Sequence, residues 1–281
     1  MNFLFWLYLF GIIVASMQDL KRREVDNWLN LFLGASGFIF VLYKSLFENN
    51  LELLLYALVA FTIMFVVMNL FYYGRVFAGG DAKLLLALSP MFVVIGIFPL
   101  LKNIGIFLFL LMLSGSLYGL LYSLILYIKG RKKANKEMRT LFRSRKFVKI
   151  LLFIGILIAA FSIILRLLNY DLWFLGILIG GLIFLFPLLY IFSKSLEKVS
   201  MVRILSGNKL REGDWLVDDV KVGSKIIKAN WEGLTKDNLK LLRGKKRVKI
   251  KEGLPFVPAF LIAFFLYYFL KDFIISFLNI F

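Results

Sequence analysis

The chain has 281 residues, a mean hydropathy of +0.84 and a formal net charge of +18, and 61% of its residues are hydrophobic. This composition excludes an ordinary soluble domain, which would be far more polar. The sequence contains neither Cys nor His. Disulfides, Ser-His-Asp or Cys-His catalysis and H-E-x-x-H zinc sites are therefore excluded, and a hydrolase here must use carboxylates, Lys, Ser, Thr or Tyr.

Hydrophobic residues fall into eight blocks, each close to the roughly 20 residues that span a bilayer. The first block is short, but it lacks a basic beginning and its positive charges follow it, so we interpret it as a span and not as a signal peptide. We expect an all-α polytopic membrane bundle of about six to eight transmembrane helices with a small cytosolic α+β module. The predicted segments are residues 2–17, 28–47, 51–73, 82–100, 104–128, 148–168, 172–192 and 254–281.

The loops between these blocks predict the orientation in the cell membrane, because Lys and Arg concentrate in cytoplasmic loops. With the first loop inside, the inner loops 18–27, 74–83, 129–149 and 193–253 hold 31 of the 35 basic residues. Both termini then lie outside. This distribution explains the basic excess, so we expect anionic membrane lipids as partners, above all at residues 129–149, and no nucleic acid. The four basic residues outside are Lys44, Lys102, Arg166 and Lys271.

Three parts of the chain follow from this reading: a bundle at residues 1–193, a cytosolic module at 194–253 and a final transmembrane helix at 254–281. In the module, β-like runs are predicted at 199–205, 215–217 and 220–222, with an edge strand at 247–251. A short helix is expected from its cap at Thr235 to Leu241-Leu242, ending at Gly244. Pro255 and Pro258 are expected to open the last helix, where a missing N–H costs little.

Two acidic residues lie where a predicted span meets the cytoplasm, and charges near a bilayer are functional candidates because burying them is costly. Asp19 closes the first segment and Asp81 opens the fourth, so both belong to the same membrane face. An acid protease needs two such carboxylates, one as general base and one as proton donor. We expect Gly79 and Gly80 to form a substrate loop, since glycine permits close approach and unusual φ values. We expect neither a metal nor a cofactor.

Other interpretations of these residues stay open at the level of sequence. Asp81 is also a suitable helix N-cap, and Asp19 could neutralise the basic residues 21–23. An ion-coupled transporter using interfacial aspartates is the main alternative function. A hydrolase built on Ser16 and Lys21, and a scaffold without chemistry, are the others.

Three segments carry a resemblance to a known family. Asp19-Leu20-Lys21-Arg22-Arg23-Glu24-Val25-Asp26-Asn27-Trp28-Leu29 resembles the first-aspartate segment of archaeal preflagellin and type IV prepilin peptidases, which are GxGD intramembrane aspartyl proteases. Ala78-Gly79-Gly80-Asp81-Ala82-Lys83 resembles their GxGD segment, and residues 251–260 are similar to their carboxy-terminal end. The resemblance implies that Asp19 and Asp81 are catalytic. It also implies that preflagellin or prepilin-like precursors with class III signal peptides are the substrates, cut at the cytoplasmic face.

The sequence departs from that pattern in places. Ala78 replaces the first glycine of GxGD, and residues 148–192 look like an additional helical pair. The loop after the first span has no Cys, unlike that of bacterial members that also methylate the new amino terminus, so we expect proteolysis alone. Helix dipoles predict that Asp81, at a helix start, is the ionised base and that Asp19, at a helix end, is the protonated acid. The basic residues 21–23 act in the opposite direction.

Overall fold

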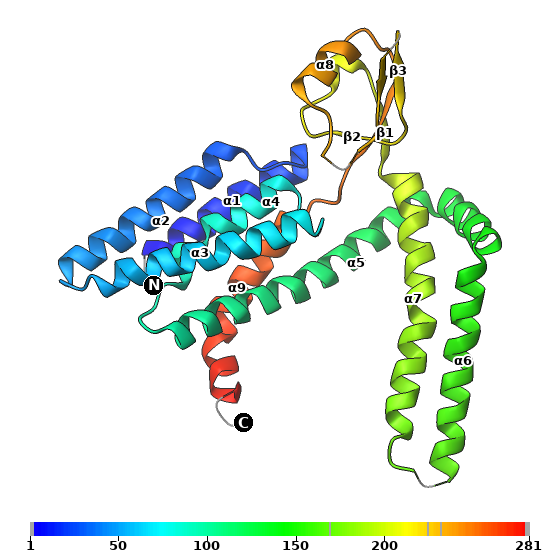
Figure 1. The fold of residues 1–281 in the computed structure, drawn as a ribbon, viewed down its shortest axis with the longest axis horizontal. Helices are drawn as coiled ribbons and strands as arrows, with labels where there is room; N and C mark the ends of the chain where they lie inside the picture. The colour runs from blue at the N-terminus through cyan, green and yellow to red at the C-terminus, as the bar shows by residue number, and fades with distance from the viewer. Residues whose placement is uncertain (1–2, 169, 224, 231, 279–281) are drawn as a thin grey trace. The chain divides into compact units, whose positions relative to one another are not determined.

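A computed structural model describes residues 3–168, 170–223, 225–230 and 232–278 (Figure 1). Seven of the helices in these residues are long and apolar enough to cross a membrane. The chain is therefore a multi-pass membrane protein, as its composition predicts. The seven helices are α1 (Phe3–Arg22), α2 (Asn27–Phe47), α3 (Glu52–Tyr73), α5 (Ile97–Ser144), α6 (Lys146–Leu167), α7 (Trp173–Ser200) and α9 (Val257–Leu278).

The chain forms two compact units, residues 1–121 with 254–281 and residues 122–253. The sequence predicted divisions at residues 193 and 253. These divisions stay predictions, and residue 193 lies inside α7, which continues to Ser200. Within the first unit, glycines allow α1 and α2 to approach closely. A Cβ on Gly11 would collide with Leu33, and one on Gly37 would collide with the Tyr8 hydroxyl.

The predicted fourth span is not a continuous helix. In its place are a nine-residue helix, α4 (Gly79–Ala87), a 3-10 turn, η1 (Ser89–Phe92), and a non-helical stretch up to α5. Pro90 lies in the turn, and Gly96 has a φ of +104°, a conformation that non-glycine residues rarely adopt. These two residues interrupt a segment whose apolar composition is that of a span. The described residues thus have seven long apolar helices where the sequence showed eight apolar segments, which is within the expected six to eight transmembrane helices.

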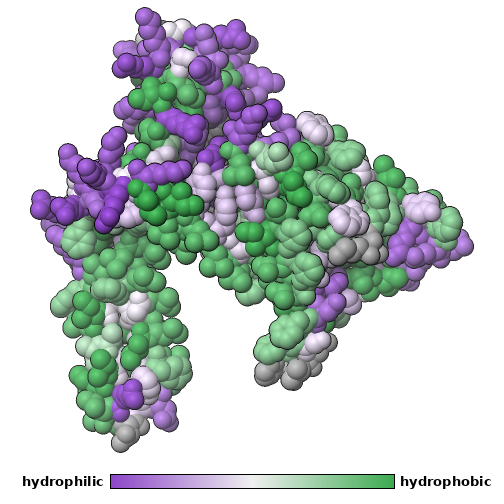
Figure 2. Space-filling model, turned by 180° about the vertical axis from the view of Figure 1, so that it is seen from behind, coloured by the Kyte–Doolittle hydropathy of each residue, from purple (hydrophilic) through white to green (hydrophobic). Residues whose placement is uncertain are grey.

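In the second unit, α6 and α7 form a closely packed pair. A Cβ on Gly155 would lie 2.8 Å from the backbone nitrogen of Phe184, and one on Gly180 would lie 2.8 Å from that of Ala159. Figure 2 shows hydrophobic side chains along this hairpin and hydrophilic ones over the sheet of the same unit. An apolar outer surface of this kind suits lipid, whose tails are as apolar as Leu.

The predicted α+β module is present, with one error of topology. Strands β1 (Val202–Leu205), β5 (Val248–Lys251) and β2 (Trp215–Leu216) form a sheet in the order β1-β5-β2. The strand at 248–251, expected at an edge, is therefore central. Its alternating pattern was read correctly, since Val248 and Ile250 are buried while Lys249 is exposed. That alternation describes the two faces of a strand and says nothing about its neighbours.

The remaining elements of the module largely follow the prediction. The strand at 220–222 is β3 (Val220–Val222), and it pairs with β4 (Lys225–Ile227), which the sequence analysis missed. Helix α8 (Lys236–Leu242) begins after Thr235, whose hydroxyl accepts a hydrogen bond from the Asn238 N–H at 3.4 Å. This confirms the predicted cap. Pro258 likewise lies at the second position of α9, as expected.

Candidate active site

Asp19 lies in the last turn of α1, and only 3% of its surface is exposed. Its Oδ2 accepts a hydrogen bond of 2.8 Å from the backbone N–H of Val257, the first residue of α9. The guanidinium of Arg23 lies close enough to act on the carboxylate. A carboxylate buried in this way needs such partners, because its charge is otherwise costly inside a protein. The beginning of the last helix, remote in sequence, therefore holds the first predicted aspartate.

Asp81 is the third residue of α4 and is 9% exposed. Ala78 is the N-cap residue, so the alternative that Asp81 caps the helix is wrong in position. Asp81 instead reaches back and accepts a hydrogen bond from the N–H of Ala78, as an acidic residue does in a capping box. Asp81 lies outside the seven long helices. Burial disfavours the charged form of Asp81, and so does the charge of Asp19 nearby.

The structure therefore brings the two predicted carboxylates together at one end of the first unit. They come from different helices, and they are near enough for one charge to act on the other. In Figure 1 the beginning of α4 lies beside the end of α1 and the turn into α2.

Gly79 and Gly80 do not form a loop. They are the first two residues of α4, and neither has a positive φ, so the expectation of unusual φ values was wrong. Close approach does occur at Gly80, where a Cβ would lie 3.1 Å from the backbone nitrogen of Val25. A Cβ on Gly79 would meet only a ring carbon of Tyr72 at 3.7 Å, an ordinary contact.

Asn30 of α2 holds the same turn of α4, and the sequence analysis missed it. Its Nδ2 donates to the carbonyl of Gly80 at 3.3 Å, and its Oδ1 is buried with no described partner. Lys83 adds a second link, donating to Oδ1 of Asn27 at 2.8 Å. Asn30 could have been found from the sequence, because it is a polar residue inside an apolar block and such residues are functional candidates.

Three aromatic rings pack together next to the segment that carries Asp81. Phe77, four residues before Asp81, lies 5.2 Å from Phe256 and 5.8 Å from Phe260 between ring centroids. Phe77 and Phe260 are buried. Rings of this size exclude water, which strengthens electrostatic interactions between nearby charges. The signal available in the sequence was the position of Phe77 and Phe256 next to the two family-like motifs.

Ser16 and Lys21 do not form a site. Ser16 is buried on the inner face of α1, whereas Lys21 is exposed in the last turn of the helix. The Ser16 hydroxyl lies one turn before Asp19 and has no partner among the described groups. The structure therefore does not support the Ser/Lys alternative.

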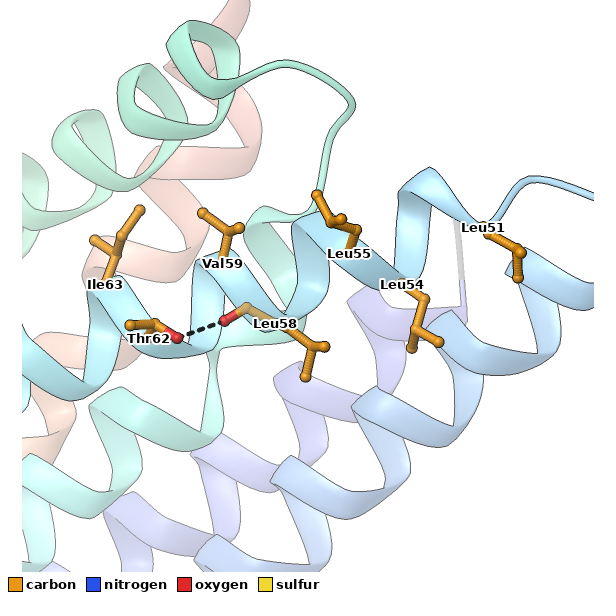
Figure 3. A pocket seen from close by; sticks show the side chains of 7 residues that line it. All are labelled: Leu51, Leu54, Leu55, Leu58, Val59, Thr62 and Ile63. Atoms are coloured by element: carbon orange, nitrogen blue, oxygen red, sulfur yellow. Dashed lines mark hydrogen bonds between the residues drawn. The ribbon is translucent and has the colours of Figure 1, made fainter.

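A shallow pocket of about 510 Å³ lies along α3, and its lining is almost wholly aliphatic (Figure 3). Its hydroxyl group belongs to Thr62, which donates to the carbonyl of Leu58 at 2.9 Å and is thereby satisfied within the helix. No lining residue can ionise, so the pocket offers no group for hydrolysis. The lining residues are Leu51, Leu54, Leu55, Leu58, Val59, Thr62 and Ile63.

Part of the chain is similar to known peptidases. Residues 6–126, which include both carboxylates, match the profile described as the type IV leader peptidase family. A preflagellin peptidase of Methanococcus maripaludis is 24% identical over 149 residues, and another of Methanococcus voltae is 26% identical over 83 residues. Residues 6–126 are thus similar to the type IV leader peptidase family. The resemblance noted in the sequence is confirmed.

The matches to these type IV leader peptidase relatives are partial. The first covers 48% of this chain and 64% of the Methanococcus maripaludis protein, and the second covers 30% of this chain and 35% of the Methanococcus voltae protein. The chain thus spans less than two thirds of the length of either relative. No solved structure matches it significantly.

Proposed function

We propose that this chain is a membrane aspartyl endopeptidase that cleaves class III signal peptides from preflagellin or prepilin-like precursors. The observation that carries the proposal is the pair formed by Asp19 and Asp81. Both are buried, they interact electrostatically, and they lie in a segment that matches a peptidase family. The curated relatives are called preflagellin peptidases, which supports the substrate class.

Two neighbouring carboxylates that share one proton supply both halves of peptide hydrolysis. The ionised carboxylate takes a proton from water as the water oxygen attacks the scissile carbonyl carbon. The protonated carboxyl gives its proton to the carbonyl oxygen. The tetrahedral species then collapses, the C–N bond breaks, and the leaving nitrogen takes the proton that came from water. No group beyond the dyad and water is needed.

We propose that cleavage occurs at the cytoplasmic face and leaves a free amino terminus. The distribution of Lys and Arg supports the orientation, with 31 of 35 in loops on the side of the dyad. The basic segment 129–149 is then positioned to contact anionic lipid headgroups. Proteolysis without methylation follows from the short loop between α1 and α2, which carries no Cys.

The test is cleavage of a class III signal-peptide substrate by the detergent-solubilised chain. Asp19→Asn and Asp81→Asn should each abolish cleavage while the protein still inserts and folds. Glu252→Gln is the matched control, since this carboxylate pairs with Arg203 in the second unit and should retain substantial activity. Normal turnover in either Asn variant would refute the dyad.

Mass spectrometry of the mature substrate tests the remainder of the proposal. A free, unmethylated amino terminus at the cytoplasmic boundary is expected. A methyl group added by this chain alone, or a cut on the outer side, would contradict it.

A further inference from the structure

We infer that the Val257 N–H at the start of α9 holds Asp19 as the ionised member of the dyad, so that Asp19 takes the proton from water and Asp81 donates one to the scissile carbonyl. This inference rests on the proposed function and assigns the two chemical roles within it. It reverses the assignment that helix dipoles alone predict.

The contact between Asp19 and α9 has the geometry of a strong hydrogen bond. The N–H of Val257 donates to Oδ2 at 2.8 Å, and both residues are buried. The first N–H groups of a helix have no partner within it, and Pro258 lacks an N–H altogether, so Val257 donates without breaking the ladder of α9. A hydrogen bond to an ionised carboxylate is about twice as strong as one between neutral groups. Ionised Asp19 is therefore the form that this donor favours.

The charged groups that face Asp19, as far as the described residues show, are Arg23 and Asp81. Arg23 lies near the carboxylate and favours its ionised form, and α4 contributes Asp81, whose own charge would repel it. Of the other basic residues nearby, Arg22 is engaged with Asp26 at 3.5 Å and is largely exposed. The negative end of the α1 dipole opposes the ionisation of Asp19. The direct hydrogen bond from Val257 and the full positive charge of Arg23 favour ionisation and outweigh the dipole.

The surroundings of Asp81 suit the neutral acid. Asp81 accepts one hydrogen bond, from Ala78, and its side chain is buried in the first turn of α4. Burial among apolar groups disfavours a charged carboxyl. When two carboxylates interact, the first proton lost comes mainly from the site that better stabilises charge, and the contacts assign that site to Asp19.

The experiment compares Val257→Pro with Val257→Ala. Both replace the buried branched side chain, but only proline removes the N–H, and proline suits the first turn of a helix. Activity requires the singly ionised dyad. The pH–rate profile of Val257→Pro should therefore lose activity at low pH, with its acidic limb moved upward by about one pH unit or more and its alkaline limb in place. Val257→Ala should keep the wild-type limbs.

Other outcomes overturn the inference. If the alkaline limb of Val257→Pro moves while the acidic limb stays, the charge resides on Asp81; if neither limb moves, the N–H does not set the charge. Cleavage activity that survives in the Asp19→Asn and Asp81→Asn variants would instead refute the proposed function, which is a distinguishable result.

If Val257→Pro does not fold, infrared spectra of the carboxyl stretch decide the matter. The protonated-carboxyl band of the wild type should persist in Asp19→Asn and disappear in Asp81→Asn. Loss of the band in Asp19→Asn alone would assign the proton to Asp19 and overturn the inference.

Discussion

Replacing Gly80 by Ala should lower activity without unfolding the protein. The new Cβ would lie 3.1 Å from the nitrogen of Val25, about 0.3 Å inside ordinary contact, and its neighbour is backbone that cannot rotate away. The first turn of α4, which carries Asp81, must therefore shift by a few tenths of an ångström. A misplacement of about 1 Å can cost about 10²-fold in rate. Scaled logarithmically, a shift of about 0.3 Å corresponds to a loss of about fourfold in kcat/KM.

The stability of the same variant should change little, because Ala is favoured over Gly inside a helix by up to about 1 kcal/mol, which offsets the tight contact. The assay is cleavage of a signal-peptide substrate in detergent, measured beside the thermal unfolding midpoint. Gly79→Ala is the matched variant, since its Cβ would make an ordinary contact at 3.7 Å, and its loss of activity should be clearly smaller. Equal effects of the two substitutions, or full activity of Gly80→Ala, would refute the argument that α4 is positioned by this approach.

Two further predictions concern positioning and orientation. Asn30→Ala removes the hydrogen bond to the Gly80 carbonyl, so kcat should fall about tenfold. The free energy of unfolding should fall by only about 1 kcal/mol, the typical net value of one hydrogen bond. An unchanged kcat in steady-state kinetics would argue against a role of Asn30 in positioning. Because the chain has no Cys, single Cys substitutions can report the orientation: an impermeant maleimide should label Asn50→Cys in intact cells, and Lys133→Cys only after permeabilisation. The reverse labelling pattern would contradict the proposed cytoplasmic face.

Composition and charge were enough to predict most of the fold, because a span must be long and apolar whatever it packs against. They failed at residues 82–100. That block has the composition of a span, and the interruption depends on two residues, Pro90 in the 3-10 turn and Gly96 with its positive φ. Hydropathy averages over such residues. The conformations of Pro and Gly were the signal that could have revealed the break.

The candidate site was partly predictable for a related reason. Asp19 and Asp81 could be identified from the sequence because an acidic residue at a membrane boundary is costly and therefore rarely accidental. The donor to Asp19 could not be identified, since it is a backbone N–H 238 residues away and every non-proline residue carries one. The sequence gives the chemical type of each side chain. Which backbone N–H donates to Asp19 depends instead on which helix ends lie together in the fold.

The broken segment also reconciles seven long helices with the basic loops. Strict alternation of seven spans would place residues 74–83 and residues 129–149 on opposite faces, against the distribution of Lys and Arg. Residues 79–96 can make the missing crossing. Its nine α-helical and four 3-10 residues rise about 22 Å, and the non-helical residues 93–96 continue the segment across a hydrocarbon core of about 30 Å.

The packing of the first unit supports such a crossing. The Asp81 end of this segment lies at the beginning of α9, beside Asp19 and Val257. Phe92, later in the segment, lies further along α9. Its ring is 5.8 Å from that of Tyr267, and Tyr267 lies about 15 Å beyond Val257 along the helix axis. A segment that enters as a short helix places the free N–H groups and positive dipole end of its first turn beside the carboxylates. A continuous helix beginning at the same residue could do this too, so what the break adds is the return to α5 through a proline turn. In the proposed topology the chain crosses the membrane here without a full-length helix. The turn that carries Asp81 contacts Val25 and accepts a hydrogen bond from Asn30, both from the neighbouring α1–α2 region. Substitutions at Gly80 and Asn30 are therefore the sharpest probes of the site.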